Sequence, residues 1–281
     1  KGQARFTVLL VPEKPHITGT FRASGVSRDG LILTDVQGAA NLAGTSGVAT
    51  ISARGRATDG QPFAAASRIQ SVPSGYAVSL DGSVGNLPLN LERPAQILRT
   101  ANGWELRPAR LLLPKGQVDA SGYWAADREL RLVLRDVDLS ILDLLRGGLG
   151  FGGKANGQLS IRSDPGAIIP SGDANLVITG LTRPGVTGIT IPVDVRLSGS
   201  SDDGGLQLGA RLSWQGNDLG RVVVRVDPGP GSTPAERFLG GALSGGVRYN
   251  GPVEPLWALV GLEGQDLLKF IGTQASSPEF W

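Results

Sequence analysis

The feature that most constrains this chain is the alternation of apolar and polar residues over short runs. At positions 205–214, apolar residues recur at every second position, from Leu206 to Trp214, separated by single polar or small residues. Because successive side chains of a strand point to opposite faces, a period of two predicts a strand with one apolar and one polar face. A second alternating run follows at 221–227, with the turn-like sequence QGND between them, so the two runs are predicted to form a hairpin.

Similar short runs, bounded by Gly, Pro, Asp or Asn, extend over most of the chain. Glycine makes up 42 of the 281 residues, but there is no Gly-x-y period, which excludes collagen. We therefore expect a mostly β protein. The periodicity changes at 136–150, where Leu139, Leu142, Leu145 and Leu149 are spaced by three and four residues. This spacing predicts a short helix over 138–146.

A second helical pattern, at 253–261, also follows a strand run, and Pro255 suits its first turn. The layout predicts a repeated unit of several antiparallel strands and one short helix. We expect an N-terminal β region over 1–135, a second unit over 136–251 and the start of a further unit over 252–281. The predicted fold is an elongated antiparallel β-sheet, curled into an open apolar groove and interrupted by short helices.

Composition and charge speak against several classes of function. The net charge is +2, with no run of five like charges, so a nucleic-acid partner is not expected. The absence of cysteine excludes disulfides, thiolate chemistry and cysteine-ligated zinc. The single histidine, His16, stands beside proline and is predicted to be an ordinary residue at a strand edge. With no G-x-S-x-G elbow, we expect no enzyme, no catalytic residue, no metal and no cofactor.

The acidic and glycine-rich segments have structural interpretations. Asp136, Asp138 and Asp143 lie close together, but the first two precede the predicted helix, where carboxylates stabilise the N-terminus. Asp202 and Asp203 are followed by two glycines, which is typical of a tight turn rather than a calcium site. The sequence FGGKANG lacks the spacing of a phosphate loop. The arginines of RVVVRVD are predicted to lie on a solvated sheet edge.

The segment 136–181 reads DVDLSILDLLRGGLGFGGKANGQLSIRSDPGAIIPSGDANLVITGL, with a D-x-x-L-L-x-L-type helix, a G-x-A-x-G-x-L-x-I strand and a G-x-A-x-L-x-I-x-G-L strand. In these features it resembles the TamB branch of the AsmA-like envelope proteins. The later segment ALSGGVRYNGPVEPLWALVGLEGQDL is similar to the family's strand that leads into a short helix. The resemblance covers roughly residues 87–272, and rests on the overall pattern of strands, glycines and short helices rather than on one diagnostic motif.

This resemblance implies an internal fragment of a long periplasmic protein, anchored in the inner membrane of a Gram-negative bacterium through a segment outside this sequence. It implies a sheet curled into an open trough, which carries phospholipids between the inner and outer membranes and supports outer-membrane biogenesis. The implied partners are phospholipid acyl chains and an outer-membrane barrel protein of the TamA type. The alternative is a scaffold for assembly or translocation of outer-membrane or autotransporter proteins, without lipid conduction.

The apolar side chains of the alternating runs are the predicted lining of this groove, and small residues such as Gly157, Ala174 and Ala210 are expected to let the wall curve. A regular β-solenoid is disfavoured by the irregular hairpins, and a glycan-active β-helix enzyme by the lack of a carboxylate cluster. The predicted lining residues are Leu130, Leu132, Leu134, Leu159, Ile161, Leu176, Ile178, Val193, Val195, Leu197, Leu206, Leu208, Leu212, Trp214, Val222, Val224 and Val226.

Overall fold

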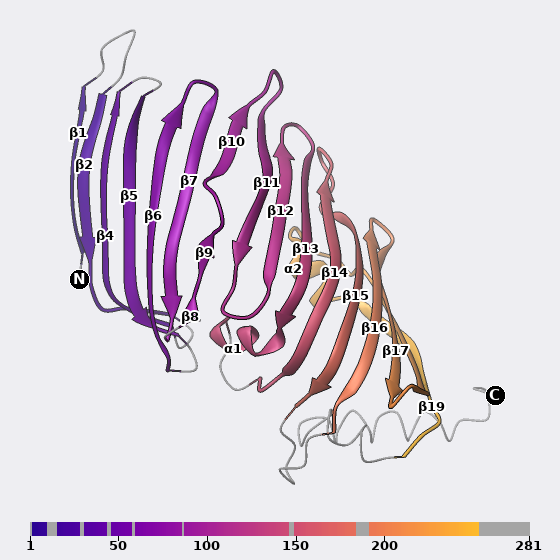
Figure 1. Ribbon diagram of the computed structural model, residues 1–281. Helices are drawn as coiled ribbons and strands as arrows, with labels where there is room; N and C mark the ends of the chain where they lie inside the picture. The colour runs from indigo at the N-terminus through magenta and orange to yellow at the C-terminus, as the bar shows by residue number, and fades with distance from the viewer. Residues whose placement is uncertain are drawn as a thin grey trace.

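The computed structural model describes residues 2–9, 16–28, 31–43, 46–57, 60–85, 87–145, 149–183 and 191–252. Within these residues, 19 strands form one sheet (Figure 1). The strands are β1 (Gly2–Leu9), β2 (His16–Ala23), β3 (Val26–Arg28), β4 (Leu31–Ala43), β5 (Ser46–Arg56), β6 (Pro62–Val72), β7 (Gly75–Val84), β8 (Leu87–Pro88), β9 (Asn90–Leu91), β10 (Ala95–Arg99), β11 (Trp104–Leu112), β12 (Gln117–Trp124), β13 (Arg128–Asp138), β14 (Gly152–Ser163), β15 (Ser171–Thr182), β16 (Val193–Asp202), β17 (Gly205–Trp214), β18 (Asn217–Asp227) and β19 (Ala242–Tyr249).

The strands follow one another across the sheet as an antiparallel meander. From β10 to β19, each strand pairs with the next one along the chain. The order is less regular between β7 and β11, where β10 pairs with one end of β7 and the short β8 with the other. Antiparallel neighbours need only short connections, which explains how many short alternating runs build one continuous sheet.

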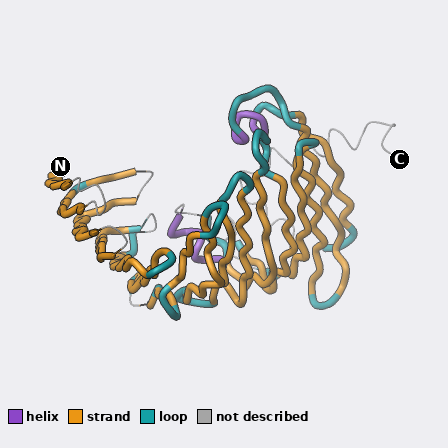
Figure 2. The backbone as a smooth tube through the Cα atoms, turned by 90° about the horizontal axis from the view of Figure 1, so that it is seen from above, coloured by secondary structure: helices purple, strands orange, loops and turns teal. Residues whose placement is uncertain are grey.

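The sheet curls without closing into a barrel, which confirms the predicted mostly β fold class. Strands contact their neighbours in the sheet, and no second sheet lies over either face in the part of the chain that the structure describes. Seen from above, the strands follow a curved path, and the short helix after β13 lies on the inner side of the curve (Figure 2). None of the helices in the described ranges is both long and apolar enough to cross a membrane.

The helix predicted at 138–146 is present over 139–145, and Arg146 lies outside the described residues. A 3₁₀ turn at Leu139–Ile141 is followed by α1 (Leu142–Leu145), and Asp138 is still the last residue of β13. Its carboxylate accepts a hydrogen bond from the backbone N–H of Ser140 at 3.0 Å, which confirms the predicted cap. Asp136 does not cap this helix. It lies at a β-bulge with φ of 50°, and its backbone N–H donates to the Asn156 side chain.

A second helix, α2 (Pro234–Leu239), was not expected from the sequence. Thr233 and Glu236 form a capping box around its first turn, and the proline stands at its start. The sequence T-P-A-E contains the capping-box residues, but a helix of six residues is too short to show a repeated apolar spacing of three and four. The helix predicted at 253–261 lies outside the described residues.

The hairpin predicted from the opening pattern is confirmed by the pairing of β17 with β18. Its loop consists of Gln215, with φ of 50°, and Gly216, with φ of 81°. Two successive residues with positive φ are typical of the type I′ turn, whose twist matches that of the flanking strands. β18 lies between β17 and β19, so the prediction that the RVVVRVD arginines lie on a sheet edge is wrong.

Candidate functional site

The candidate site is one face of the sheet, which we call the apolar face. Residues directly opposite each other on antiparallel strands point to the same side, so the register decides which side chains share a face. One row runs from Leu159 through Ala174, Gly199 and Leu208 to Val224 on five successive strands. The strand pairing therefore joins the predicted lining residues of separate runs into one surface.

Neighbouring rows on this face are also apolar. The next row crosses β15 to β19 through Leu176, Leu197, Ala210, Val222 and Val247. Alternation along each strand and pairing between strands place all 17 predicted lining residues, from Leu130 to Val226, on this one face. The rows cross the strands, so the apolar face extends along the length of the sheet.

The apolar face has two parts that differ in burial. At one end of β16–β18, Val193, Val195, Leu212 and Leu219 form a buried cluster, with Val193 fully inaccessible. Elsewhere the face is half-buried, as at Leu208 and Val224, or open, as at Ile161, which is 46% exposed. The buried cluster is a structural core, whereas the rest of the apolar face is partly open to solvent.

The other face, which we call the polar face, is more exposed. Along β16, the polar-face residues Asp194, Arg196, Ser198 and Ser200 are exposed, whereas Val195 and Leu197, on the apolar face, are buried and half-buried. This asymmetry shows that the alternation read from the sequence distinguishes two physically different surfaces.

The apolar face continues into the N-terminal half, beyond the predicted lining residues. Register links Leu130 through Gly122, Leu106 and Ile97 to Tyr76 on β7. The rings of Tyr76 and Trp104 stack there, with their centroids 5.7 Å apart. The sequence indicates this extension through the alternation in the first third of the chain. Many apolar positions there are alanine, so the difference in hydropathy between the two faces is small.

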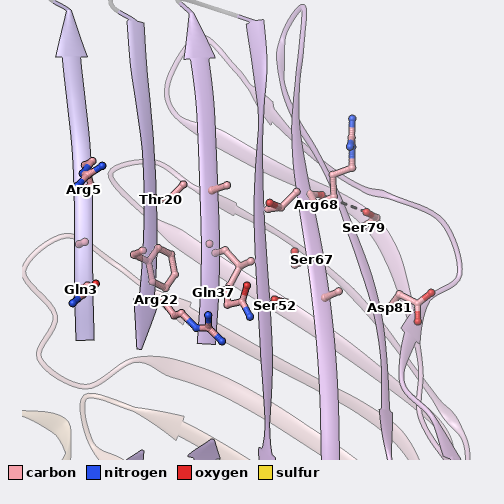
Figure 3. A pocket seen from close by; sticks show the side chains of 17 residues that line it. Gln3, Arg5, Thr20, Arg22, Gln37, Ser52, Ser67, Arg68, Ser79 and Asp81 are labelled. Carbon is pink, nitrogen blue, oxygen red and sulfur yellow. Dashed lines mark hydrogen bonds between the residues drawn. The ribbon is translucent and has the colours of Figure 1, made fainter. Parts of the chain in front are cut away.

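A depression of about 1130 Å³ lies on the polar face of the N-terminal strands (Figure 3). Arg5, Thr20, Ser52, Arg68 and Asp81 are among the residues around it, from β1 to β7. Arg22 at its border pairs with Asp35 at 3.0 Å. This hollow was not predictable from the sequence, because it depends on how the strands curve rather than on the composition of any one strand.

The arginines on the polar face of the middle strands have acidic partners. Arg110 and Arg135 both pair with Asp119, at 2.6 and 3.2 Å. Arg131 and Arg162 both pair with Glu129, at 3.4 and 3.1 Å. Each of these two carboxylates is shared by two arginines, so every one of the four arginines has an acidic partner within 3.4 Å.

Asp119 should contribute to stability in a pH-dependent way. The hydrogen bond from Arg110 lowers the pKa of the Asp119 carboxyl, so the folded state favours its ionised form. A carboxyl with a lowered pKa stabilises the fold above its unfolded pKa of about 3.9, and this contribution is lost as the pH falls through the folded pKa. Asp119→Asn should cost up to about 1 kcal/mol at pH 7, since the pair is partly exposed.

Urea unfolding of both forms at pH 7 and near pH 3 measures this effect. The difference in unfolding free energy should shrink at the lower pH, because the Asp119 carboxyl of the unfolded state becomes protonated there while the lowered pKa of the folded state is approached. A difference that does not change with pH would contradict the assigned role of the charge.

The groups considered for chemistry in the sequence each make a local contact in the structure. His16 is the first residue of β2, which lies inside the sheet, and its ring contacts the Asn41 side chain at 2.9 Å. Asp202 accepts a hydrogen bond from the backbone N–H of Gly204 at 2.8 Å, as expected of a turn. Asp143 accepts one from the N–H of Gly150. Among the described residues, no group of three or more His, Cys, Asp or Glu side chains is placed to hold a metal ion.

No protein-family model, no curated protein and no solved structure matches this chain.

Proposed function

We propose that this chain carries phospholipid acyl chains along its apolar face, as a non-enzymatic segment of a periplasmic protein that connects the inner and outer membranes. The observation that carries the proposal is the register, which aligns apolar side chains in continuous rows across β13–β19 on a face that no second sheet covers in the described ranges. A folded protein rarely leaves so long an apolar surface open unless another apolar molecule contacts it.

Acyl chains fit this surface because it offers area without polar anchors. Each methylene removed from water contributes about 0.8 kcal/mol at full burial, and less on a face that is open on one side. Rows such as Leu176, Leu197, Ala210 and Val222 provide the same chemistry on every strand, so a chain can move from one row to the next without a deep energy minimum. This property favours transport over tight storage.

The cellular setting that we propose follows from the resemblance of 136–181 to the TamB branch. It places the chain in the periplasm of a Gram-negative bacterium, with an inner-membrane anchor outside this sequence and an outer-membrane barrel protein of the TamA type as partner. No nucleic acid, cofactor or catalytic residue has a part in this proposal.

Lipid retention by the purified chain tests the proposal. Leu208→Gln and Val224→Gln, directly opposite each other on the apolar face, should together reduce co-purified phospholipid by roughly tenfold or more, since each removes apolar contact worth about 1 kcal/mol. The measurement is native mass spectrometry with lipid extraction. Leu212 is unsuitable for this test because it belongs to the buried cluster.

The matched control makes the same change on the other face. Val177 and Val223 are exposed on the polar face, so Val177→Gln and Val223→Gln should leave the lipid content unchanged. Equal loss from both variants would contradict the role of the apolar face. A wild-type chain that purifies as a stable monomer without lipid would favour the scaffold function instead.

A further inference from the structure

Four arginines stand in one line on the polar face of the last four strands. Arg196 on β16 is directly opposite Arg211 on β17, Arg211 is opposite Arg221 on β18, and Arg221 is opposite Arg248 on β19. All four side chains are exposed. We call this set the arginine row. With neighbouring strands about 4.8 Å apart, it extends over roughly 14 Å.

This arrangement works against the stability of the sheet. Like charges directly opposite each other on neighbouring strands destabilise a β-sheet, and here three such contacts follow in succession. Over β11–β14 of the same face, four arginines have Asp119 or Glu129 as an acidic partner within 3.4 Å. Among the described residues, Arg211 is the only arginine of the row that has an ion pair. Its partner is Asp218, at 3.9 Å.

The surroundings of the arginine row leave it with a net positive charge. On one side lie Gly209, Val223 and Gly246, which carry no charge. On the other side lie Asp194 and Asp218, of which Asp194 accepts a hydrogen bond from the Gly180 N–H. The row therefore presents four guanidinium groups against two carboxylates, on an exposed part of the sheet.

The chemistry of the row points to several phosphate groups on one surface. Guanidinium groups bind phosphate oxygens bidentately, and four in line cover more length than a single phosphate. The polar-face rows of β15–β19 contain no aromatic side chain, so they lack both the stacking platforms for nucleic-acid bases and the aromatic anchors of protein interfaces. We propose that the arginine row binds the headgroup phosphates of an anionic phospholipid membrane.

This contact goes beyond acyl-chain transport and lies on the opposite face of the sheet. It would hold the β16–β19 end of the sheet against a membrane surface through charge alone. Each arginine close to an anionic lipid surface contributes about fivefold in binding, and the attraction weakens as salt increases. The contact is therefore reversible and depends on the composition of the membrane.

Vesicle sedimentation of the full chain tests the proposal. Vesicles of equimolar phosphatidylglycerol and phosphatidylcholine should bind the chain, whereas phosphatidylcholine vesicles should not. Arg196→Gln with Arg221→Gln should weaken binding to the anionic vesicles by roughly 25-fold. These changes remove like-charge contacts, so the variant should unfold at a temperature no lower than that of the wild type, which excludes misfolding as the cause.

The control removes the same number of positive charges from the same face, but at other positions. Arg131→Gln with Arg162→Gln removes arginines that already pair with Glu129, and should weaken vesicle binding by less than about threefold. Equal losses from the two double variants, or equal binding of the wild type to both kinds of vesicle, would overturn the proposal. Tighter binding of inorganic tripolyphosphate than of the anionic vesicles would also overturn it, in favour of a soluble phosphate ligand.

Acyl-chain binding and membrane binding can be contradicted independently of each other. Leu208→Gln with Val224→Gln changes no charge, so this variant should lose co-purified lipid and keep its binding to anionic vesicles. The arginine double variant should show the opposite behaviour.

Discussion

Gly157→Val should prevent the C-terminal strands from folding, or destabilise them by at least about 3 kcal/mol. Gly157 lies on β14 with φ of 145°, a backbone conformation that residues with a side chain rarely adopt. A Cβ atom at this position would lie 2.0 Å from the carbonyl oxygen of Asn175 and 2.8 Å from the Cα atom of Leu176, both on β15. These atoms belong to the backbone of a paired strand, so they cannot move aside without breaking the ladder.

Guanidinium unfolding followed by circular dichroism measures this loss. Gly246→Val is the matched control, because Gly246 also lies in a strand but has no positive φ, and a Cβ atom there would have nothing within 4 Å. Valine favours strands, so this control should be neutral or slightly stabilising. Similar stabilities for Gly157→Val and the wild type would contradict the close approach of β14 and β15.

The behaviour of Gly157 also shows which part of the fold the sequence could predict. Alternation predicted the strands and assigned Leu159, Ile161 and the other lining residues to one face correctly, because a period of two depends only on the local backbone. The sequence also suggested small residues in the wall. It did not indicate that Gly157 has a positive φ, or that a Cβ atom there would meet the backbone of β15. Both properties depend on how β14 pairs with its neighbouring strand.

Register is the main property that the sequence left open. The arginines at 196, 211, 221 and 248 are spread over more than fifty positions, and nothing in the local pattern aligns them. Their alignment follows from the hairpin turns and the bulge between Leu212 and Ser213, which set the pairing of each strand. Without the register, the sequence predicts a solvated sheet edge for the two arginines in RVVVRVD, although β18 is an interior strand.

The division of the apolar face into a buried cluster and an open part was likewise not predictable. Val193, Val195, Leu206 and Val224 occupy equivalent positions in the alternation, so the sequence assigned them one role. The structure separates them by their place along the strands, with the first two packed in the cluster and the last two half-buried. The cluster is the packed core at this end of the sheet, and the rest of the apolar face is partly open to solvent.

Val195→Asp should therefore destabilise the protein by at least about 4 kcal/mol at pH 7, whereas Val224→Asp, the same change on the same face, should cost about 1 kcal/mol. Val195 is 6% exposed and packs in the cluster with Val193, Leu212 and Leu219. A carboxylate there loses its hydration, and no cationic side chain belongs to this cluster to compensate. Val224 is only half-buried, so an aspartate at that position can reach water.

The pH dependence of this variant distinguishes a buried charge from a simple loss of packing. Burial in the cluster would raise the pKa of the new carboxyl, so its destabilising effect should grow as the pH rises through the unfolded pKa of about 3.9. Val195→Asn, which is close in size and uncharged, should show no such dependence. Urea unfolding of the three variants between pH 4 and pH 7 measures the effect, and parallel curves for the two Val195 variants would mean that this end of the apolar face is open to water.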